Sequence, residues 1–271
     1  PMTRRMKMTR NKKSKTKTKP DPAVMLAELA NRLSLTAIRN QIPQLLAQAE
    51  TNALSYSDFA LTMLQLEVDT RENRRLTRNL KRSGLPTVIE GLDTYDFSVR
   101  PKLEAPLVRE LENCRFVEEN GRNIICVGRP GLGKSRVLDV IARAACDKGY
   151  SVRKILTAEL LEELHASLVD GSYNRTFRKY EKYDILYMEE FGYAPFDSDS
   201  TKHLFRLVSA RHRQRSILLA ANTGFNNWNS FFPSEAQAVA TVDRLIDNAT
   251  ILRFSGKGFR KPKEIIGEAV D

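Results

Sequence analysis

The fold of this chain is decided by residues 123–136, which read Asn123-Ile124-Ile125-Cys126-Val127-Gly128-Arg129-Pro130-Gly131-Leu132-Gly133-Lys134-Ser135-Arg136. The apolar first part predicts a buried strand, and the residues from Lys134 onward predict a helix. Between them lies the pattern G-x-x-x-x-G-K-[ST], a loop that cradles phosphates. A chance match in a chain of 271 residues is on the order of one in a hundred. The stretch therefore predicts a P-loop nucleotide-binding site.

Each residue type in this loop has a chemical reason. The glycines permit backbone angles that direct amide N–H groups at phosphate oxygens. Lys134 is expected to reach the β- and γ-phosphates of ATP, and the Ser135 hydroxyl to join the coordination shell of Mg²⁺. The helix that begins at Lys134 adds the positive end of its dipole. The predicted nucleotide contacts are Gly128, Arg129, Pro130, Gly131, Leu132, Gly133, Lys134, Ser135 and Arg136.

Two further strand ends supply candidate catalytic groups. After Asp184, the apolar run 185–188 is followed by Glu189 and Glu190, where a Walker B motif normally has Asp followed by Glu. We assign Glu189 to Mg²⁺ and Glu190 as the general base that activates water. The longer carboxylate in the metal position leaves the rate of hydrolysis open. Asn222 ends the next predicted strand, from where its side chain can orient the attacking water.

Phosphoryl transfer usually requires a cation on the developing charge, often an arginine from a neighbouring subunit. The first candidate is Arg244, just before the last predicted strand. Arg211 and Arg213, near the end of the helix that precedes the strand over 216–221, are the alternatives. The sequence pattern alone does not rank the three.

The order of elements after residue 122 is typical of an α/β fold. Helical segments, most of ten or more residues, alternate with short apolar runs, which predicts a five-stranded parallel sheet with flanking helices. We place the ATPase domain over 85–271 and interpret 85–121 as a linker with a leading helix over 107–116. The predicted strands are 123–127, 152–156, 185–189, 216–221 and 249–254.

A small all-α domain, for DNA binding or oligomerisation, is predicted over 21–84. Its apolar residues recur at helical spacing, and Gly84-Leu85-Pro86 breaks its last helix. Five arginines with offsets of 3, 4, 7 and 11 lie on one face of that helix. Such a face favours phosphate binding over a merely solvated surface. The five are Arg71, Arg74, Arg75, Arg78 and Arg82.

Most of the net charge of +11 lies at the N-terminus, where residues 1–19 contain nine lysines and arginines and no acidic residue. Like-charge repulsion predicts a disordered basic tail over 1–20, suited to a polyanion or serving as a solvated arm. Three cysteines without metal-ligand spacing indicate a reducing compartment. No apolar stretch approaches the roughly 18 residues of a membrane span. We therefore expect a cytoplasmic protein without a membrane partner.

Together these motifs resemble the AAA+ superfamily and, more narrowly, the IstB helper ATPases of insertion-sequence transposition, which are related to DnaC helicase loaders. The similarity runs from about residue 22 to 261. The match over Asp243-Arg244-Leu245 supports Arg244 as the trans-acting finger. Family members generally have Thr-His where this chain has Ser135-Arg136, and Asp where it has Glu189. The segments that carry the resemblance are 71–76, 95–98, 128–135, 183–193 and 242–245.

The resemblance implies a bacterial, ATP-dependent homo-oligomer with nucleotide at its subunit interfaces. It would bind duplex target DNA, largely without sequence preference, and stimulate a partner transposase, IstA. A DnaC-like helicase loader is the alternative that would share every nucleotide residue. A nucleotide-gated DNA scaffold with little hydrolysis is a third interpretation, motivated by Glu189.

Overall fold

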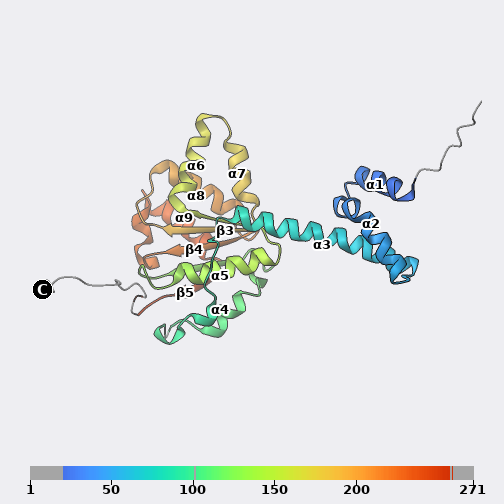
Figure 1. Cartoon of the computed structure of the whole chain (residues 1–271). Helices are drawn as coiled ribbons and strands as arrows, with labels where there is room; N and C mark the ends of the chain where they lie inside the picture. Colours follow the sequence, from blue (N-terminus) through green and yellow to red (C-terminus); the bar gives the residue numbers. More distant parts are fainter. Residues whose placement is uncertain (1–20, 101, 257, 259–271) are drawn as a thin grey trace, which may run out of the picture. The chain divides into compact units, whose positions relative to one another are not determined.

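Figure 1 shows the computed structural model of the chain, which describes residues 21–100, 102–256 and 258. The tail predicted over 1–20 lies outside the described residues. The chain divides into two compact units, Pro1–Asn73 and Arg74–Asp271. This division falls inside helix α3 (Tyr56–Ser83), ahead of the boundary that the sequence predicts near residue 84.

The described part of the first unit is helical, as predicted. It contains α1 (Pro22–Arg32), α2 (Thr36–Thr51) and the first part of α3. A small apolar cluster with Ile38 and Ile42 at its centre holds these helices together. The buried carboxylate of Glu67 on α3 accepts hydrogen bonds from the first N–H groups of α2, at 2.8 and 3.2 Å. It thereby satisfies donors that a helix start leaves without an intrahelical partner.

The second unit is built on a five-stranded parallel sheet. Its order is β2-β3-β4-β1-β5, and all four pairings are parallel. All five predicted strands are confirmed, although the third extends past a bulge and the fifth ends one residue early. Parallel strands place their carboxyl ends along one edge of the sheet, where sites of α/β proteins form. The bounds are β1 Asn123–Val127, β2 Val152–Leu156, β3 Ile185–Phe191, β4 Ser216–Ala221 and β5 Ala249–Arg253.

Helices cover both faces of this sheet (Figure 1). One face packs against α5 (Lys134–Asp147) and the chain that precedes β1. The other face is covered by α6, α7, α8 and α9. Successive residues of β1 alternate between these two cores, since Ile124 and Ile125 belong to different ones. The covering helices are α6 Thr157–Val169, α7 Tyr173–Lys182, α8 Ser198–Arg211 and α9 Glu235–Ile246, with a 3-10 segment η4 at Phe225–Phe231.

The segment predicted as a linker over 85–121 is a packed part of the second unit. Its helix is shorter than predicted, α4 (Ala105–Leu111), because Cys114 takes a left-handed φ of 58° shortly after it. Leu92, Tyr95 and Phe116 are buried in the same core as α5. Three single-turn 3-10 segments complete it: η1 Leu92–Thr94, η2 Phe97–Val99 and η3 Arg115–Val117.

The end of α3 lies against β2, whose outer edge has no neighbouring strand in the sheet. Arg153 donates a hydrogen bond to the carbonyl of Arg82 at 3.3 Å. A Cβ on Gly84 would lie 2.7 Å from the carbonyl oxygen of Lys154. The chain that leaves α3 therefore covers an edge that would otherwise be open to pairing with another strand.

No helix in the described ranges combines the length and the hydrophobicity that a membrane crossing needs.

Candidate nucleotide-binding site

A cavity of about 550 Å³ opens at the carboxyl edge of the sheet. The P-loop, which joins β1 to α5, forms one wall of it. The ends of β3 and β4 bring polar side chains to the same space. The cavity is lined by Lys134, Ser135, Arg136, Glu189, Glu190 and Asn222, which the sequence predicts as site residues, together with Lys154 and Glu90.

The start of the P-loop is too crowded for any side chain. A Cβ on Gly128 would lie 2.3 Å from the carbonyl oxygen of Phe254, and the residue has a φ of 152°. Phe254 in turn donates its backbone N–H to Val127 at 2.8 Å. Glycine at 128 therefore lets the chain after β5 approach the loop closely.

The far end of the loop is held from outside the cavity. The carbonyl of Leu132 accepts hydrogen bonds from the Tyr95 hydroxyl at 3.2 Å and from Nε of Arg100 at 3.1 Å. The C=O of Leu132 and the N–H of Gly133 belong to the same trans peptide and point in opposite directions. Because Tyr95 and Arg100 bind this C=O, the N–H of Gly133 points away from them. Gly133 lines the cavity. Sequence reasoning missed this support, although Tyr95 lies in a segment that carries the family resemblance.

Lys134 places its ammonium group at the centre of the loop. The side chain is buried, and Nζ contacts the carbonyl oxygens of Gly128 at 2.6 Å and Arg129 at 2.9 Å. It also donates to Oδ1 of Asn222 at 3.0 Å. The loop lysine and the polar residue at the end of β4 are thus brought together.

Arg136 makes contacts that its prediction as a nucleotide contact did not include. Its guanidinium forms an ion pair with Glu90 at 2.9 Å and donates to the carbonyl of Gly91 at 2.8 Å. It also contacts the Thr94 hydroxyl. Arg136 therefore ties α5 to the preceding segment, and contact with a nucleotide stays a prediction.

Glu189 is held in place by three polar groups. Its carboxylate accepts from the Tyr187 hydroxyl at 2.8 Å and lies 3.2 Å from Nζ of Lys154. Burial raises its pKa, but the hydrogen bond from Ser135 and the contacts with Lys154 and Tyr187 outweigh burial. The pKa of Glu189 is therefore below its ordinary value, and the side chain is ionised at neutral pH. Its carboxylate and the Ser135 hydroxyl are oxygen ligands of the kind Mg²⁺ prefers, so the pair fits this ion.

Glu190 has an unusual backbone for a non-glycine residue. Its φ is 55°, and a bulge interrupts the pairing of β3 with β4 between Met188 and Phe191. The left-handed conformation turns the side chain out of the strand, and Glu190 lines both the main cavity and a neighbouring cavity of about 400 Å³. Strain of this kind persists where the surroundings enforce it, often at functional sites.

We expect Gly192→Ala to destabilise the turn that follows Glu190. Gly192 has a φ of 69°, and an added Cβ would lie 1.9 Å from the ring of Phe231. The expected loss in free energy of unfolding is about 2–4 kcal/mol, from overpacking and the left-handed alanine. Denaturant unfolding followed by the fluorescence of Trp228, the single tryptophan, measures it.

The matched control is Gly171→Ala. Gly171 has nearly the same φ, 70°, but no atom within 4 Å of an added Cβ. The free energy of unfolding of Gly171→Ala should fall by only about 1 kcal/mol, the cost of a left-handed backbone conformation for alanine. Equal losses at the two positions would contradict the assigned clash with Phe231.

Sequence reasoning missed a partly buried charged cluster behind Glu189. Lys154 on β2 lies 2.7 Å from the carboxylate of Asp139 on α5 and contacts Glu189 as well. The available signal was a lysine in the middle of an apolar strand and an aspartate on the apolar face of a helix. Neither residue belongs to a motif, so the cluster can be recognised only from their contact in the structure.

Comparison with known proteins gives the family of the chain. A model of the family "IstB-like ATP binding protein" matches residues 28–265. The chain belongs to this family. The resemblance to IstB-like proteins that the motifs indicate is therefore confirmed. The fold is the predicted five-stranded parallel sheet with a P-loop between β1 and α5.

Two relatives of the IstB-like chain illustrate the similarity. The insertion sequence IS21 ATP-binding protein of Pseudomonas aeruginosa is 31% identical over 235 residues, covering 87% of this chain and 88% of the relative. The corresponding IS5376 protein of Geobacillus stearothermophilus is 28% identical over 233 residues, covering 86% and 92%. Among solved structures, the DnaC helicase loader is 16% identical with a TM-score of 0.45, covering 66% of this chain and 99% of that one.

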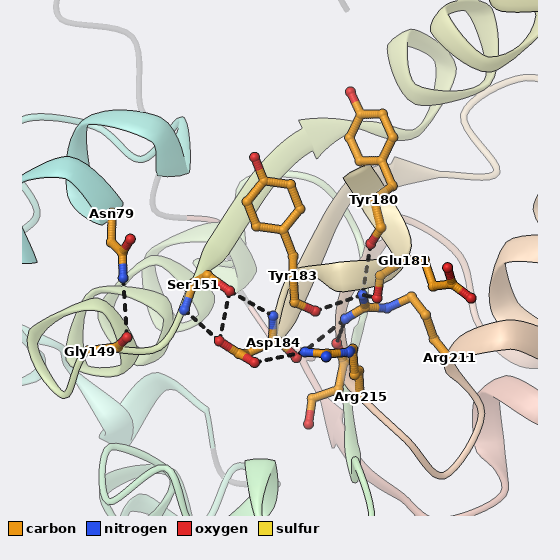
Figure 2. A network of polar contacts seen from close by, with 10 residues as sticks. Asn79, Gly149, Ser151, Tyr180, Glu181, Tyr183, Asp184, Arg211 and Arg215 are labelled. Carbon is orange, nitrogen blue, oxygen red and sulfur yellow. Dashed lines mark hydrogen bonds and ion pairs between the residues drawn. The ribbon is translucent and has the colours of Figure 1, made fainter. Parts of the chain in front are cut away.

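Of the three arginine candidates for a trans-acting finger in this IstB-like chain, Arg211 is excluded. It is 1% exposed, and its guanidinium donates to five backbone carbonyls (Figure 2). These bonds join the end of α8 to the loop before β3, where Asp184 also holds Ser151 and Arg215. Arg211 is therefore a structural residue that cannot reach a neighbouring subunit. The acceptors are Tyr180, Glu181, Tyr183, Asp184 and Ser216.

Arg244 and Arg213 lie far from the P-loop of their own chain. The carbonyl of Leu245 accepts from the Asn123 side chain, at the start of β1, whereas the P-loop follows its end. Arg244 donates to the carbonyl of Ala240 at 2.7 Å, and Arg213 pairs with Asp247 at 2.9 Å. Either arginine can therefore serve only a nucleotide held by another subunit.

Proposed function

We propose that this chain hydrolyses ATP and binds duplex DNA, and that it regulates transposition by oligomerising on target DNA and stimulating the transposase IstA. The observation that carries the proposal is the convergence of Lys134, Glu189, Glu190 and Asn222 on one cavity. The names of the relatives, which are insertion sequence ATP-binding proteins, support the link to transposition.

The residues of the cavity divide the work of phosphoryl transfer. Lys134 and the loop N–H groups bind the β- and γ-phosphates, and Ser135 and Glu189 would hold Mg²⁺, which neutralises phosphate charge when bound. Glu190 accepts a proton from the attacking water at its carboxylate. Asn222 orients that water through its side-chain amide. Arg244 of a neighbouring subunit supplies the cation that the developing charge requires.

The DNA-binding surface that we propose lies on the second part of α3. Arg74, Arg75, Arg78 and Arg82 are all exposed there. Leu80, on the opposite side of this part, packs against the core of the second unit. Asn79, one turn after Arg75, donates to the carbonyl of Gly149 at 3.1 Å, and an added Cβ on Gly149 would lie 2.5 Å from a guanidinium nitrogen of Arg75. Arg74, Arg78 and Arg82 are therefore on the face of the helix that packing leaves accessible, and Arg75 lies at its border, beside Gly149.

Arg71, the fifth predicted arginine, belongs to the first unit. Its Nε forms an ion pair with Glu67 at 2.9 Å, and its Nη2 donates to the carbonyl of Ser34 at 2.9 Å. These contacts hold α3 to the loop before α2. A further contact of Arg71 with DNA stays a prediction.

Replacing Arg74, Arg78 and Arg82 together with alanine is expected to weaken the salt dependence of DNA binding. Each lost phosphate contact removes about 0.9 from the slope of log K against log salt concentration, so the slope should become shallower by about 2–3. Fluorescence anisotropy with a random-sequence duplex, titrated at several salt concentrations, gives the slope.

A triple alanine variant of Arg175, Arg178 and Lys182 on α7 removes the same charge from another exposed helix surface. It should leave the slope close to that of the unaltered protein. If both variants and the unaltered protein have equal slopes, the arginine face does not bind DNA phosphates and is only a solvated surface.

Electron microscopy of the protein with long duplex DNA tests the proposed function as a whole. With a non-hydrolysable ATP analogue we expect regular oligomers on the duplex, and none without nucleotide. Assembly on single-stranded DNA alone would point instead to a helicase loader.

A DNA scaffold with little hydrolysis is the second candidate function, because Glu189 is engaged by Lys154 and Tyr187. Steady-state ATP hydrolysis, measured with and without duplex DNA, separates the two. Nucleotide-dependent assembly without DNA-stimulated turnover would favour the scaffold.

A further inference from the structure

The nucleotide cavity contains a second, partly buried ammonium group besides that of Lys134. Lys154 projects into it from β2, with 13% of its side chain exposed. Its Nζ lies 2.7 Å from Oδ1 of Asp139 and 3.2 Å from Oε2 of Glu189. The ammonium also lies 5.0 Å from the centre of the Tyr187 ring.

A purely structural role for Lys154 would need one carboxylate. A buried ammonium is costly unless it is paired, and Asp139 satisfies that need at the shorter distance. The second partner, Glu189, is the carboxylate that accepts a hydrogen bond from Ser135 in the cavity. Lys154 therefore reaches the metal position of the site in addition to its structural partner. With one ammonium and two carboxylates, the cluster has a formal charge of −1.

We propose that Lys154 is a resident cation at the metal end of the nucleotide site, which holds Glu189 before Mg²⁺ arrives and competes with Mg²⁺ for that carboxylate. The inference rests on the proposed nucleotide site and adds a regulating residue to it. Its consequence is that ATP binding depends less on Mg²⁺ than it would without this lysine.

Two electrostatic effects act in the same direction. The ammonium beside Glu189 repels a divalent cation and so weakens Mg²⁺ binding, whereas its charge attracts phosphate and strengthens the binding of metal-free ATP. Both reduce the ratio between the dissociation constants of ATP without and with Mg²⁺. By thermodynamic linkage this ratio also gives the effect of ATP on Mg²⁺ affinity.

The test is equilibrium binding of the fluorescent analogue mant-ATP to the full chain, in EDTA and in saturating MgCl₂. Lys154→Met is expected to raise the ratio of the two dissociation constants at least about tenfold, because a unit charge a few ångströms away is lost from the site. The concentration of MgCl₂ that gives half-maximal binding should fall in the same variant.

A double variant keeps the test sharp, because Lys154→Met alone leaves two buried carboxylates without their cation. Asp139→Asn with Lys154→Met preserves the formal cluster charge of −1 and removes the ammonium beside Glu189. It should raise the ratio as well. Lys202→Met removes an exposed lysine that pairs with Asp199 at 2.9 Å, and it should change nothing.

The outcomes distinguish this inference from the proposed function. A ratio in both Lys154 variants that equals or falls below that of the unaltered protein overturns the role of Lys154 alone. If the unaltered protein binds mant-ATP neither in EDTA nor in saturating MgCl₂, the nucleotide site itself is overturned.

Discussion

Lys134→Ala is expected to lower the affinity for ATP at least about a hundredfold, since it removes charge-assisted hydrogen bonds to two phosphate groups. The ammonium is held at the centre of the loop by the carbonyls of Gly128 and Arg129 and by Asn222. Because an ammonium has three donors, phosphate oxygens would replace at least one of these acceptors on binding. Isothermal titration calorimetry with ATP measures the loss. ATP-dependent protection of duplex DNA from nuclease should disappear with it.

The control for Lys134→Ala is Lys148→Ala, just after the end of the same helix. Lys148 is exposed and donates to the carbonyl of Asn113 at 2.7 Å, away from the cavity. This variant should bind ATP normally. ATP-dependent protection that survives in Lys134→Ala would contradict the assignment of the P-loop as the nucleotide site.

Glu190→Gln is expected to slow hydrolysis at least about a hundredfold while nucleotide binding persists, because a general base contributes a factor of this order. The amide keeps the size of the side chain and the left-handed turn at a φ of 55° but cannot accept the proton of water. Bound ATP should therefore persist, together with the DNA-bound oligomer. Single-turnover hydrolysis and retention on immobilised duplex DNA measure the two effects.

Glu162→Gln is the matched control for the base. Glu162 is an exposed glutamate that lines the neighbouring cavity together with Glu190. Its replacement should leave hydrolysis unchanged. Normal hydrolysis in Glu190→Gln would show that another residue is the general base. The adjacent carboxylate, Glu189, would then be the next candidate.

The sheet could be predicted from the sequence because its central strands are buried on both faces. Every residue of β1 and β4 is buried, so each appears in the sequence as a short apolar run between turn residues. The P-loop follows from glycines that no other residue can replace, as the crowding at Gly128 shows. Local patterns of this kind can be interpreted without knowledge of the rest of the fold.

Contacts between distant segments could not be predicted in this way. The two donors to the Leu132 carbonyl come from Tyr95 and Arg100, in a stretch whose turn residues indicate a linker. Likewise, Lys154 and Asp139 meet only when β2 lies beside α5. No periodicity in the sequence records such pairs, since each depends on how separate elements pack.

The three arginine candidates show the same limit. Arg211 and Arg213 are two residues apart in the sequence, yet one is buried among carbonyls and the other is 61% exposed. A helix end places neighbouring side chains in different surroundings, and residue type alone does not reveal which one faces the interior.

The contact between the end of α3 and the edge of β2 has a mechanical consequence. Arg153 is bonded to the carbonyl of Arg82, and the next residue, Lys154, contributes its side chain to the nucleotide cavity. An extended strand is nearly inextensible, with at most about 3.6 Å per residue. A displacement of the helix end that moves β2 along its axis therefore moves the Lys154 backbone by nearly the same distance. In this chain, one residue of strand separates the support of the arginine-bearing helix from a charge that lines the nucleotide cavity.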